Sequence, residues 1–502
     1  MSKLAPVTSY AGADIREPAR GLAGIAERLS TRNKWIAIAL IAALLGLVCL
    51  RSWVFLFFPH SHMDSDQAVF GIMAKDIALG RAYPLFMYGQ RYMLAIGSWL
   101  CAPLFLAFGI SVVTLKLPMF LMNIASVGML WIALRRELDR WGTALAILPF
   151  AACSVVVASR LVEHQGGNIE PIFFLVLAFL LRERPLLLGL VLGIAFLNRE
   201  FAPIGLVALV LMDAWAGCLR ATYKRYLIAG AVAGGVAVLV RFIAAHTPWY
   251  TGNPPYAGWQ DVFEGEGIRG FFGLQLPMLL NATPLELRGK NITSNLAVGH
   301  EWILYVVGAL GLLALAGGSA QPRRDFRGIS TYLVLVGMAQ AAAFILLCPI
   351  PQDSMVVRYI LVCLCVLIGM TAWAWKRPAL RGWVAALVLS VSAANASDAL
   401  SLSLEYLRDP PVHEYETLAH ALRERGVKYA TANYWVAYDV SWLTNEAVII
   451  SPPWGEADRV ARYHSIIERH AQEHVYISDS SCSNGVAVLR WYLCKAPPPH
   501  AP

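Results

Sequence analysis

Two carboxylates, Asp64 and Asp66, lie one residue apart directly after the first long apolar run of the sequence. A carboxylate can act as a general base by taking the proton of a hydroxyl or amine that attacks a sugar. Carboxylates are also favoured at a helix N-terminus, where free N–H groups and the helix dipole stabilise negative charge. The residue types therefore leave two interpretations of the pair open, namely capping and catalysis.

The residues that follow the pair have the spacing of a helix. Val69, Met73 and Ile77 recur near the helical period, and Gly80 is a natural stop. The pattern predicts an amphipathic helix over residues 66–80 that lies along the outer membrane surface.

A polar cluster comes after this helix and has the side chains that line sugar pockets. They offer hydrogen bonds and stacking, although tyrosine is also common at the interfaces of any membrane protein. The candidate substrate-binding residues of this cluster are Tyr88, Gln90, Arg91 and Tyr92.

Four further candidates lie beside later apolar runs. Arg358 and Arg199 are candidates for holding a phosphate, because a guanidinium group matches phosphate oxygens bidentately. The alternatives are snorkelling to the interface for Arg358 and an ion pair with Glu200 for Arg199. His164 is either a metal ligand or a hydrogen-bonding loop residue. Glu170 begins an apolar run, where an acid is costly unless it faces protein or water.

The composition indicates the class of protein that must position these residues. Of 502 residues, 58% are hydrophobic and 15% are charged, whereas soluble domains carry about 25% charged residues. The mean hydropathy is +0.55. The apolar residues come in runs separated by short basic segments, which is typical of a polytopic membrane protein. The net charge of +8 is spread over these segments and forms no single stripe, so we expect no nucleic-acid partner.

Eleven apolar runs predict about eleven transmembrane helices in a mainly α fold. A spanning helix needs about 20 apolar residues, so the fourth, fifth and sixth runs are short. The runs are Trp35–Phe58, Phe105–Leu134, Trp141–Ser159, Ile169–Leu181, Leu186–Leu197, Phe201–Trp215, Tyr226–Ala245, Trp302–Gly317, Ile329–Ile350, Ile360–Trp375 and Trp383–Leu402.

The basic residues predict the orientation, because Lys and Arg accumulate in cytoplasmic segments. They gather in alternate segments, provided that the fifth and sixth runs are separate crossings. We therefore expect a cytoplasmic segment at 1–34 and a membrane domain at 35–402. The outer loops of that domain are expected at 59–104 and 246–301, and an extracytoplasmic α/β domain at 403–502. The expected location is the bacterial cytoplasmic (inner) membrane.

The tail alternates helix-like and strand-like stretches, which predicts a small α/β domain. It also holds Cys482 and Cys494, which either pair in an oxidising compartment or remain free thiols. The expected helices are His413–Arg425 and Asp458–His470, and the expected strands are Ala447–Ser451, His474–Ser478 and Val486–Leu493.

The stretch that begins at Asp64, DSDQAVFGIMAKDIALGRAYPLFMYGQRYM, resembles the first outer loop of the C-type (GT-C) membrane glycosyltransferases. It is most similar to bacterial members related to protein O-mannosyltransferases and to the lipid A aminoarabinose transferase. The resemblance implies that Asp66 is the catalytic carboxylate. This chain has Gln67 where the family commonly has Glu, so Asp64 either substitutes for a second acid or only caps. Weaker similarities are residues 166–170, Arg358 with Tyr359, and ANYWVAY at residues 432–438.

The resemblance implies a GT-C fold and transfer of a sugar from a polyprenyl-phosphate donor, with inversion, to a lipid, glycan or protein acceptor. It assigns acceptor contact or metal binding to Glu170. No cofactor is certain, and a divalent cation is left open. The alternatives are a transporter or lipid flippase, which would need broken or charged segments near the midplane, and a non-catalytic envelope-assembly protein.

Overall fold

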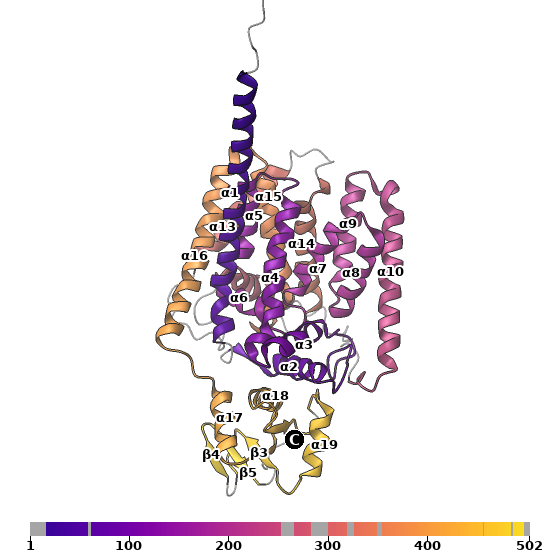
Figure 1. Cartoon of the computed structure of the whole chain (residues 1–502), viewed down its shortest axis with the longest axis vertical. Coiled ribbons are helices and arrows are strands. Elements are labelled where there is room, and N and C mark those ends of the chain that lie inside the picture. Colours follow the sequence, from indigo (N-terminus) through magenta and orange to yellow (C-terminus); the bar gives the residue numbers. More distant parts are fainter. Residues whose placement is uncertain are drawn as a thin grey trace, which may run out of the picture. The chain divides into compact units, whose positions relative to one another are not determined.

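The computed structural model describes residues 17–58, 62–252, 266–282, 300–318, 326–348, 354–454, 456–482 and 485–495. These residues are mainly helical and include one small sheet (Figure 1). The chain divides into two compact units, residues 1–43 and 44–502. Helix α1 (Glu17–Phe57) begins well before the expected first span at Trp35. Residues 1–16 of the expected cytoplasmic segment lie outside the described part, as do 253–265 and 283–299 of the expected long outer loop.

Most of the remaining helices follow from the apolar runs. They are α2 (Ser65–Ala78), α3 (Ile96–Phe108), α4 (Val112–Leu134), α5 (Arg140–Ala151), α6 (Val155–Val162), α7 (Glu170–Leu180), α8 (Pro185–Asn198), α9 (Ala202–Trp215), α10 (Leu219–Ala245), α11 (Glu266–Gly270), the π-helical turn η2 (Phe271–Gln275), α12 (Leu276–Leu280), α13 (Trp302–Gly318), α14 (Ile329–Leu347), the 3₁₀ segments η5 (Ser354–Cys363) and η6 (Pro378–Leu380), α15 (Leu364–Trp375) and α16 (Arg381–Arg408).

Six helices of the described part are long and apolar enough to cross a membrane, or seven if the bent pair α5 and α6 is one span. Five more apolar helices are shorter, so the expected count of eleven spans remains a prediction. The expected single run Phe105–Leu134 is wrong, because α3 ends at Phe108 and Gly109, with φ of +86°, turns the chain before α4. Only glycine adopts that conformation readily.

The surface of α10 shows why these helices need a lipid environment. Its side chains Leu227, Val238 and Phe242 are 65%, 70% and 62% exposed. Soluble proteins rarely expose large contiguous apolar patches. The chain is therefore an integral membrane protein.

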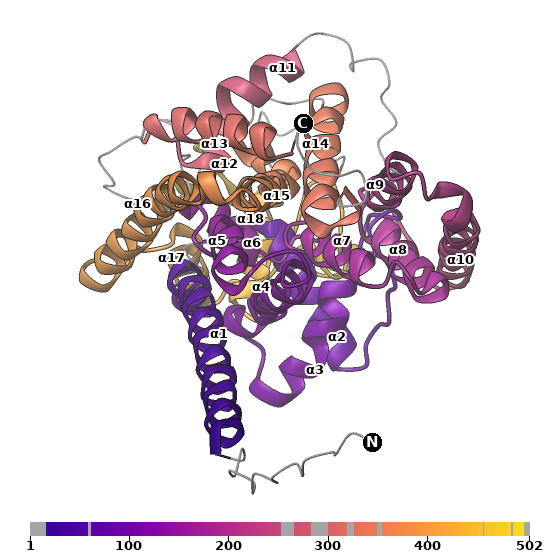
Figure 2. The ribbon, with the colours of Figure 1, turned by 90° about the horizontal axis from the view of Figure 1, so that it is seen from above.

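Helices α8, α9 and α10 lie together at one side of the bundle (Figure 2). Two glycines of α8 permit this packing. A Cβ atom at Gly189 would lie 2.6 Å from the Ala229 carbonyl oxygen, and one at Gly193 would lie 2.9 Å from that of Ala233. Small residues allow apolar helices to approach closely without a polar contact.

Helix α2 (Ser65–Ala78) lies close to the expected 66–80, but it is not amphipathic. Twelve of its residues are buried, including the charged residues Lys75 and Asp76. The helix is covered by α3 and, from the other end of the chain, by α18 (Tyr434–Leu443). The expected exposed polar face is wrong because its charged residues have partners in the C-terminal domain.

The C-terminal domain contains a five-stranded sheet in the order β2-β1-β3-β5-β4. Strand β1 is parallel to β2 and β3, and β5 is antiparallel to β3 and β4. Helices α17 and α19 match the two expected helices, and the expected strand Val486–Leu493 is instead a hairpin. Cys482 and Cys494 form a disulfide. The elements are α17 (Glu414–Glu424), β1 (Tyr429–Thr431), α18 (Tyr434–Leu443), β2 (Ile449–Ser451), α19 (Ala461–Arg469), β3 (Val475–Ser478), β4 (Val486–Val488) and β5 (Trp491–Cys494).

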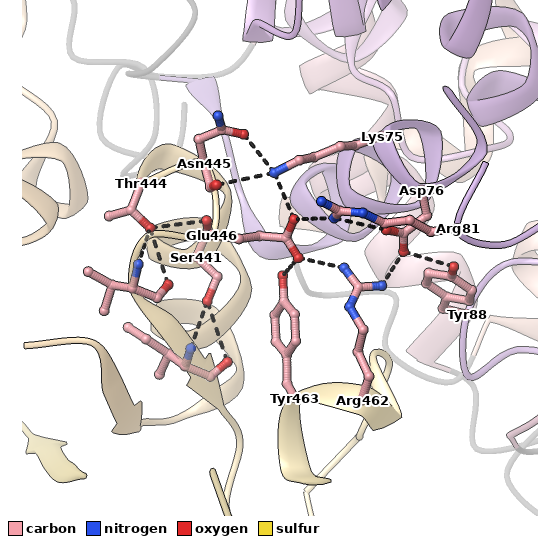
Figure 3. Close-up of polar contacts among 12 residues, drawn as sticks. Lys75, Asp76, Arg81, Tyr88, Ser441, Thr444, Asn445, Glu446, Arg462 and Tyr463 are labelled. Atoms are coloured by element: carbon pink, nitrogen blue, oxygen red, sulfur yellow. Dashed lines mark hydrogen bonds and ion pairs between the residues drawn. The ribbon is translucent and has the colours of Figure 1, made fainter. Parts of the chain in front are cut away.

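An ion network, which we call the α2 clamp, joins this domain to α2 (Figure 3). It consists of Lys75, Asp76, Glu446 and Arg462. Lys75 Nζ lies 2.7 Å from Glu446 Oε2, and Arg462 Nη2 lies 2.5 Å from Glu446 Oε1. The Arg462 guanidinium also pairs with Asp76, which accepts a 3.0 Å hydrogen bond from Tyr88 Oη. Each of these charges is therefore compensated across the junction.

The turn that carries Glu446 has an unusual backbone. Asn445 and Glu446 have φ values of +55° and +63°. Asn tolerates this region, whereas Glu rarely adopts it. Lys75 Nζ donates to Asn445 Oδ1 at 2.7 Å as well as pairing with Glu446. The clamp therefore stabilises a conformation that the local sequence disfavours.

The clamp predicts an acid-sensitive junction. Burial by itself would raise the pKa of Glu446, but Lys75 and Arg462 lower it to about 2. Because the folded-state pKa lies below the ordinary value of about 4.3, its contribution to stability is present above that pH and is lost as the pH falls towards 2. We expect Glu446→Gln to lower the free energy of unfolding by about 3 kcal/mol at neutral pH.

Thermal unfolding in detergent micelles at pH 7 and pH 4 measures this effect. The matched control is Glu424→Gln, since the Glu424 side chain is 64% exposed and faces only His420 among its ion-pair partners in the described part. Equal Tm values for the two variants at pH 7 would contradict a role of the clamp in stability.

Candidate active site

Asp66 lies in the first turn of α2 with its side chain 24% exposed. Its Oδ2 lies 3.7 Å from Nη1 of Arg358, which η5 contributes. Its Oδ1 accepts a 2.7 Å hydrogen bond from Oη of Tyr434, the first residue of α18. The two oxygens of one carboxylate are thus held by a cation from the membrane domain and a phenol from the C-terminal domain.

Asp64 is the N-cap of α2, as its position in the sequence allows. Its Oδ1 accepts a 2.9 Å hydrogen bond from the Gln67 backbone N–H, and its Oδ2 accepts a 2.5 Å hydrogen bond from Gln165 Nε2. The Gln165 Oε1 atom in turn accepts a 2.6 Å hydrogen bond from Arg358 Nη1. Gln165 therefore connects Asp64 to the cation that faces Asp66.

The two carboxylates have different electrostatic environments. Burial, the charge of Asp66 and the charge of Glu163 raise the pKa of Asp64 to about 7. A large fraction of Asp64 is consequently protonated near neutral pH. Asp66 instead faces the Arg358 cation, and its side chain is partly exposed.

Arg199, at the end of α8, lies beside this group. Its Nε donates to the Gly166 carbonyl at 2.8 Å, and its guanidinium lies 5.9 Å from the centre of the Tyr359 ring. Arg358 lies 5.2 Å from the same ring. A Cβ at Gly167, where φ is +106°, would lie 2.5 Å from Arg199 Nε. The glycine is therefore required both by its backbone conformation and by the close approach of the arginine.

The sequence matches no model of a protein family and no curated protein. Solved structures do match. ArnT from Cupriavidus metallidurans, bound to undecaprenyl phosphate, has a TM-score of 0.56 at 12% identity, over 92% of this chain and 97% of that one. The oligosaccharyltransferase of Archaeoglobus fulgidus, in complex with Zn and sulfate, has a TM-score of 0.52 at 12% identity, over 87% of this chain and 68% of that one.

The chain has the C-type membrane glycosyltransferase fold. At 12% identity, the comparison establishes only how the helices and strands are arranged. The roles of individual residues must be argued from their contacts in the site.

The resemblance of the first loop implies an acid at the position of Gln67, and the structure explains why an amide fits there. Gln67 is 1% exposed; its Nε2 donates to the His62 carbonyl at 3.1 Å, and its Oε1 accepts from the His164 backbone N–H at 3.4 Å. Lys116 Nζ also donates to the His62 carbonyl, at 2.9 Å. A carboxylate could not make the first of these bonds. Gln67 therefore holds two loops together and does not face the exposed edge of the site.

His164 and Glu170 both organise the loop between α6 and α7. His164 is fully buried, and its Nδ1 lies 2.7 Å from the Leu115 carbonyl oxygen, so this nitrogen donates. Burial lowers the pKa of His164 to about 4, and its ring packs against Phe70. Glu170 Oε2 accepts a 2.9 Å hydrogen bond from the Asn168 backbone N–H. Both side chains are thus engaged in packing the loop that presents Gln165.

The structure separates the polar cluster of residues 88–92. Tyr92 is half-buried, and burial raises its pKa, whereas the charges of Arg199 and Arg459 lower it. Tyr88 instead donates to Asp76 in the α2 clamp. Arg91 is exposed and lies 5.4 Å from the Tyr250 ring centre, and Gln90 is half-buried.

Sequence reasoning assigned no role to three residues of the site: Gln165, Tyr434 and Arg459. Arg459 Nη1 donates to the Gly89 carbonyl at 2.9 Å, and its guanidinium lies 5.9 Å from the Tyr434 ring centre. Tyr434 lies within ANYWVAY, so that motif was an available signal for it. No group of three or more His, Cys, Asp or Glu side chains suited to a metal ion occurs among the described residues.

The contacts of Gln67 generate a prediction. We expect Gln67→Glu to lower the free energy of unfolding by about 1–3 kcal/mol at pH 8, because the buried carboxylate cannot donate to the His62 carbonyl. The loss should be smaller at pH 5, where the buried acid is more fully protonated and donates again.

Thermal unfolding at both pH values measures the change, with Gln472→Glu as the exposed matched control. A Gln67→Glu protein as stable as the wild type at pH 8 would show that the amide is not required.

Proposed function

We propose that this chain is an inverting glycosyltransferase that takes a sugar from a polyprenyl-phosphate donor and transfers it to a lipid, glycan or protein acceptor. The observation that carries the proposal is the half-buried Asp66 carboxylate facing Arg358 at 3.7 Å. The fold shared with ArnT, which was solved with undecaprenyl phosphate, supports a donor of this class.

Asp66 is the general base of the proposed reaction. The acceptor hydroxyl or amine loses its proton to Asp66 and forms a bond with the anomeric carbon. The bond from that carbon to the phosphate oxygen breaks on the opposite face, and its electron pair leaves with the polyprenyl phosphate. Configuration at the anomeric carbon is thereby inverted.

Arg358 stabilises the charge that develops on the departing phosphate. Its Nε is buried and has no hydrogen-bond partner among the described residues, while Nη1 is held by Gln165. A phosphate oxygen is the acceptor such a nitrogen needs. Arg199 approaches the same Tyr359 ring as Arg358, and Arg199 and Tyr92 are further candidates for contacts with the donor.

The remaining proposals follow from the sequence. The protein lies in a bacterial cytoplasmic membrane with its N-terminus inside, and about eleven helical segments place the site and the domain at 403–502 outside. The Archaeoglobus structure is a complex with Zn and sulfate, which keeps a divalent cation among the proposals. Adding EDTA to the transfer assay tests whether the reaction needs one.

Asp66→Asn tests the base directly. We expect a loss of transfer of at least about 100-fold with a labelled polyprenyl-phosphate sugar, because the amide cannot take the proton. Asp64→Asn is the matched control, since Asn also caps a helix. We expect it to retain more than about a tenth of the activity. Full activity in Asp66→Asn refutes the catalytic assignment. If the variant instead loses a lipid-transport activity that does not depend on sugar transfer, the flippase alternative is favoured.

Arg358→Lys tests the phosphate contact. Lysine keeps the charge but loses the planar set of donors, so we expect the KM for the donor to rise about tenfold and kcat to fall. The control is Arg269→Lys, because the Arg269 side chain is 80% exposed. The initial rate at varied donor concentration measures both constants. An unchanged KM and kcat in Arg358→Lys would remove this residue from the donor site.

A further inference from the structure

Tyr434 reaches Asp66 from a different part of the chain, and its backbone is fixed. Asn433 caps α18 by accepting a 3.1 Å hydrogen bond from the Val436 backbone N–H. The Tyr434 backbone N–H donates to Glu456 Oε2 at 2.8 Å. The side chain therefore leaves the helix at its first residue, where the C-terminal domain meets α2.

The helix that carries Tyr434 is attached to the helix that carries Asp66. Ser65 Oγ lies 2.8 Å from the Tyr434 carbonyl oxygen and 2.7 Å from that of Trp435, and it accepts a 3.2 Å hydrogen bond from the Asp439 backbone N–H. Further along, α2 meets α18 so closely that a Cβ at Gly71 would lie 2.8 Å from the Trp442 ring. Because Ser65 precedes Asp66, the two helices hold the phenol and the carboxylate in one geometry.

The phenol is the donor of the 2.7 Å hydrogen bond, since an ionised carboxylate only accepts. Burial and the charge of Asp66 raise the pKa of Tyr434 above its usual range, so the phenol keeps its proton. The Tyr434 ring also packs edge-on against Tyr438, with 5.2 Å between ring centres. These contacts prevent the phenol from turning away from Oδ1.

We propose that Tyr434 is a positioning residue of the active site, so that the C-terminal domain supplies part of the catalytic apparatus. The inference rests on the proposed function. With Oδ1 engaged by the phenol, Oδ2 is the oxygen that faces Arg358 and receives the acceptor proton. The hydrogen bond also favours the ionised form of the carboxylate, which extends its action as a base to lower pH.

The test is the pH dependence of sugar transfer in Tyr434→Phe, which removes one oxygen and keeps the ring. We expect kcat at neutral pH to fall about tenfold and the KM for the donor to stay within about twofold. We expect the acid limb of the pH–rate profile to move up by about one pH unit, because a carboxylate that loses a donor binds a proton more readily. A structural defect alone would leave the limb where it is.

Two further proteins make the test specific. Replacing Tyr434 by 3-fluorotyrosine gives a more acidic phenol, so the acid limb should move down. Tyr429→Phe is the matched control, because the Tyr429 ring stacks on His470 at 4.0 Å in another part of the domain. Its profile should equal that of the wild type.

The outcomes separate this inference from the proposed function. If the wild type transfers sugar and both Tyr434 variants keep its pH profile, Tyr434 is not a positioning residue and the proposed function stands. If the wild type transfers no sugar from a polyprenyl-phosphate donor, the proposed function and the role of Tyr434 are both wrong. Opposite shifts in the two Tyr434 variants support the inference.

Discussion

The burial of α2 is the constraint on which the rest of the site depends. A charged side chain that leaves water must find a partner, or its burial costs several kcal/mol. Lys75 and Asp76 find their partners on Glu446 and Arg462, and Asp66 finds one on Arg358. Docking of the C-terminal domain and alignment of the proposed base therefore have the same physical cause, which is the compensation of charges on one buried helix.

The elements with strong local signals were predictable from sequence. The apolar runs, the start of α2 and the two helices α17 and α19 follow from composition, caps and periodicity. The polar face expected for α2 failed for a physical reason. Lys75 and Asp76 have the pattern of a solvated face, but the acceptors of Lys75 lie 370 residues away on Asn445. The spacing of polar and apolar residues indicates which side of a helix is charged. It does not indicate whether a segment distant in sequence covers that side.

The site divides in the same way. Asp66 was predictable because its neighbours form a local motif. Arg358 was predictable because a cation beside an apolar run either binds a phosphate or snorkels to the interface. The contacts of Tyr434 with Asp66 and of Gln165 with Asp64 were not predictable, since they span 368 and 101 residues. Tyr, Trp and Val have low helix propensity, so the stretch YWV gives no local sign of α18. The Asn433 cap and packing against α2 determine that helix instead.

The acids around α2 differ in their partners rather than in their chemical type. Burial, with the charge of Asp66, raises the pKa of Asp64 to about 7. Burial and the charge of Asp64 raise the pKa of Asp439 well above its ordinary value, and neither carboxyl oxygen of Asp439 has a hydrogen-bond partner in the described part of the chain. Asp66 has both a cation and a phenol donor. A neutral amide at Gln67 adds no further charge to this group. Asp66 is thus an acid of this group that is partly exposed and held by both a cation and a phenol, which is the environment the proposed general base requires.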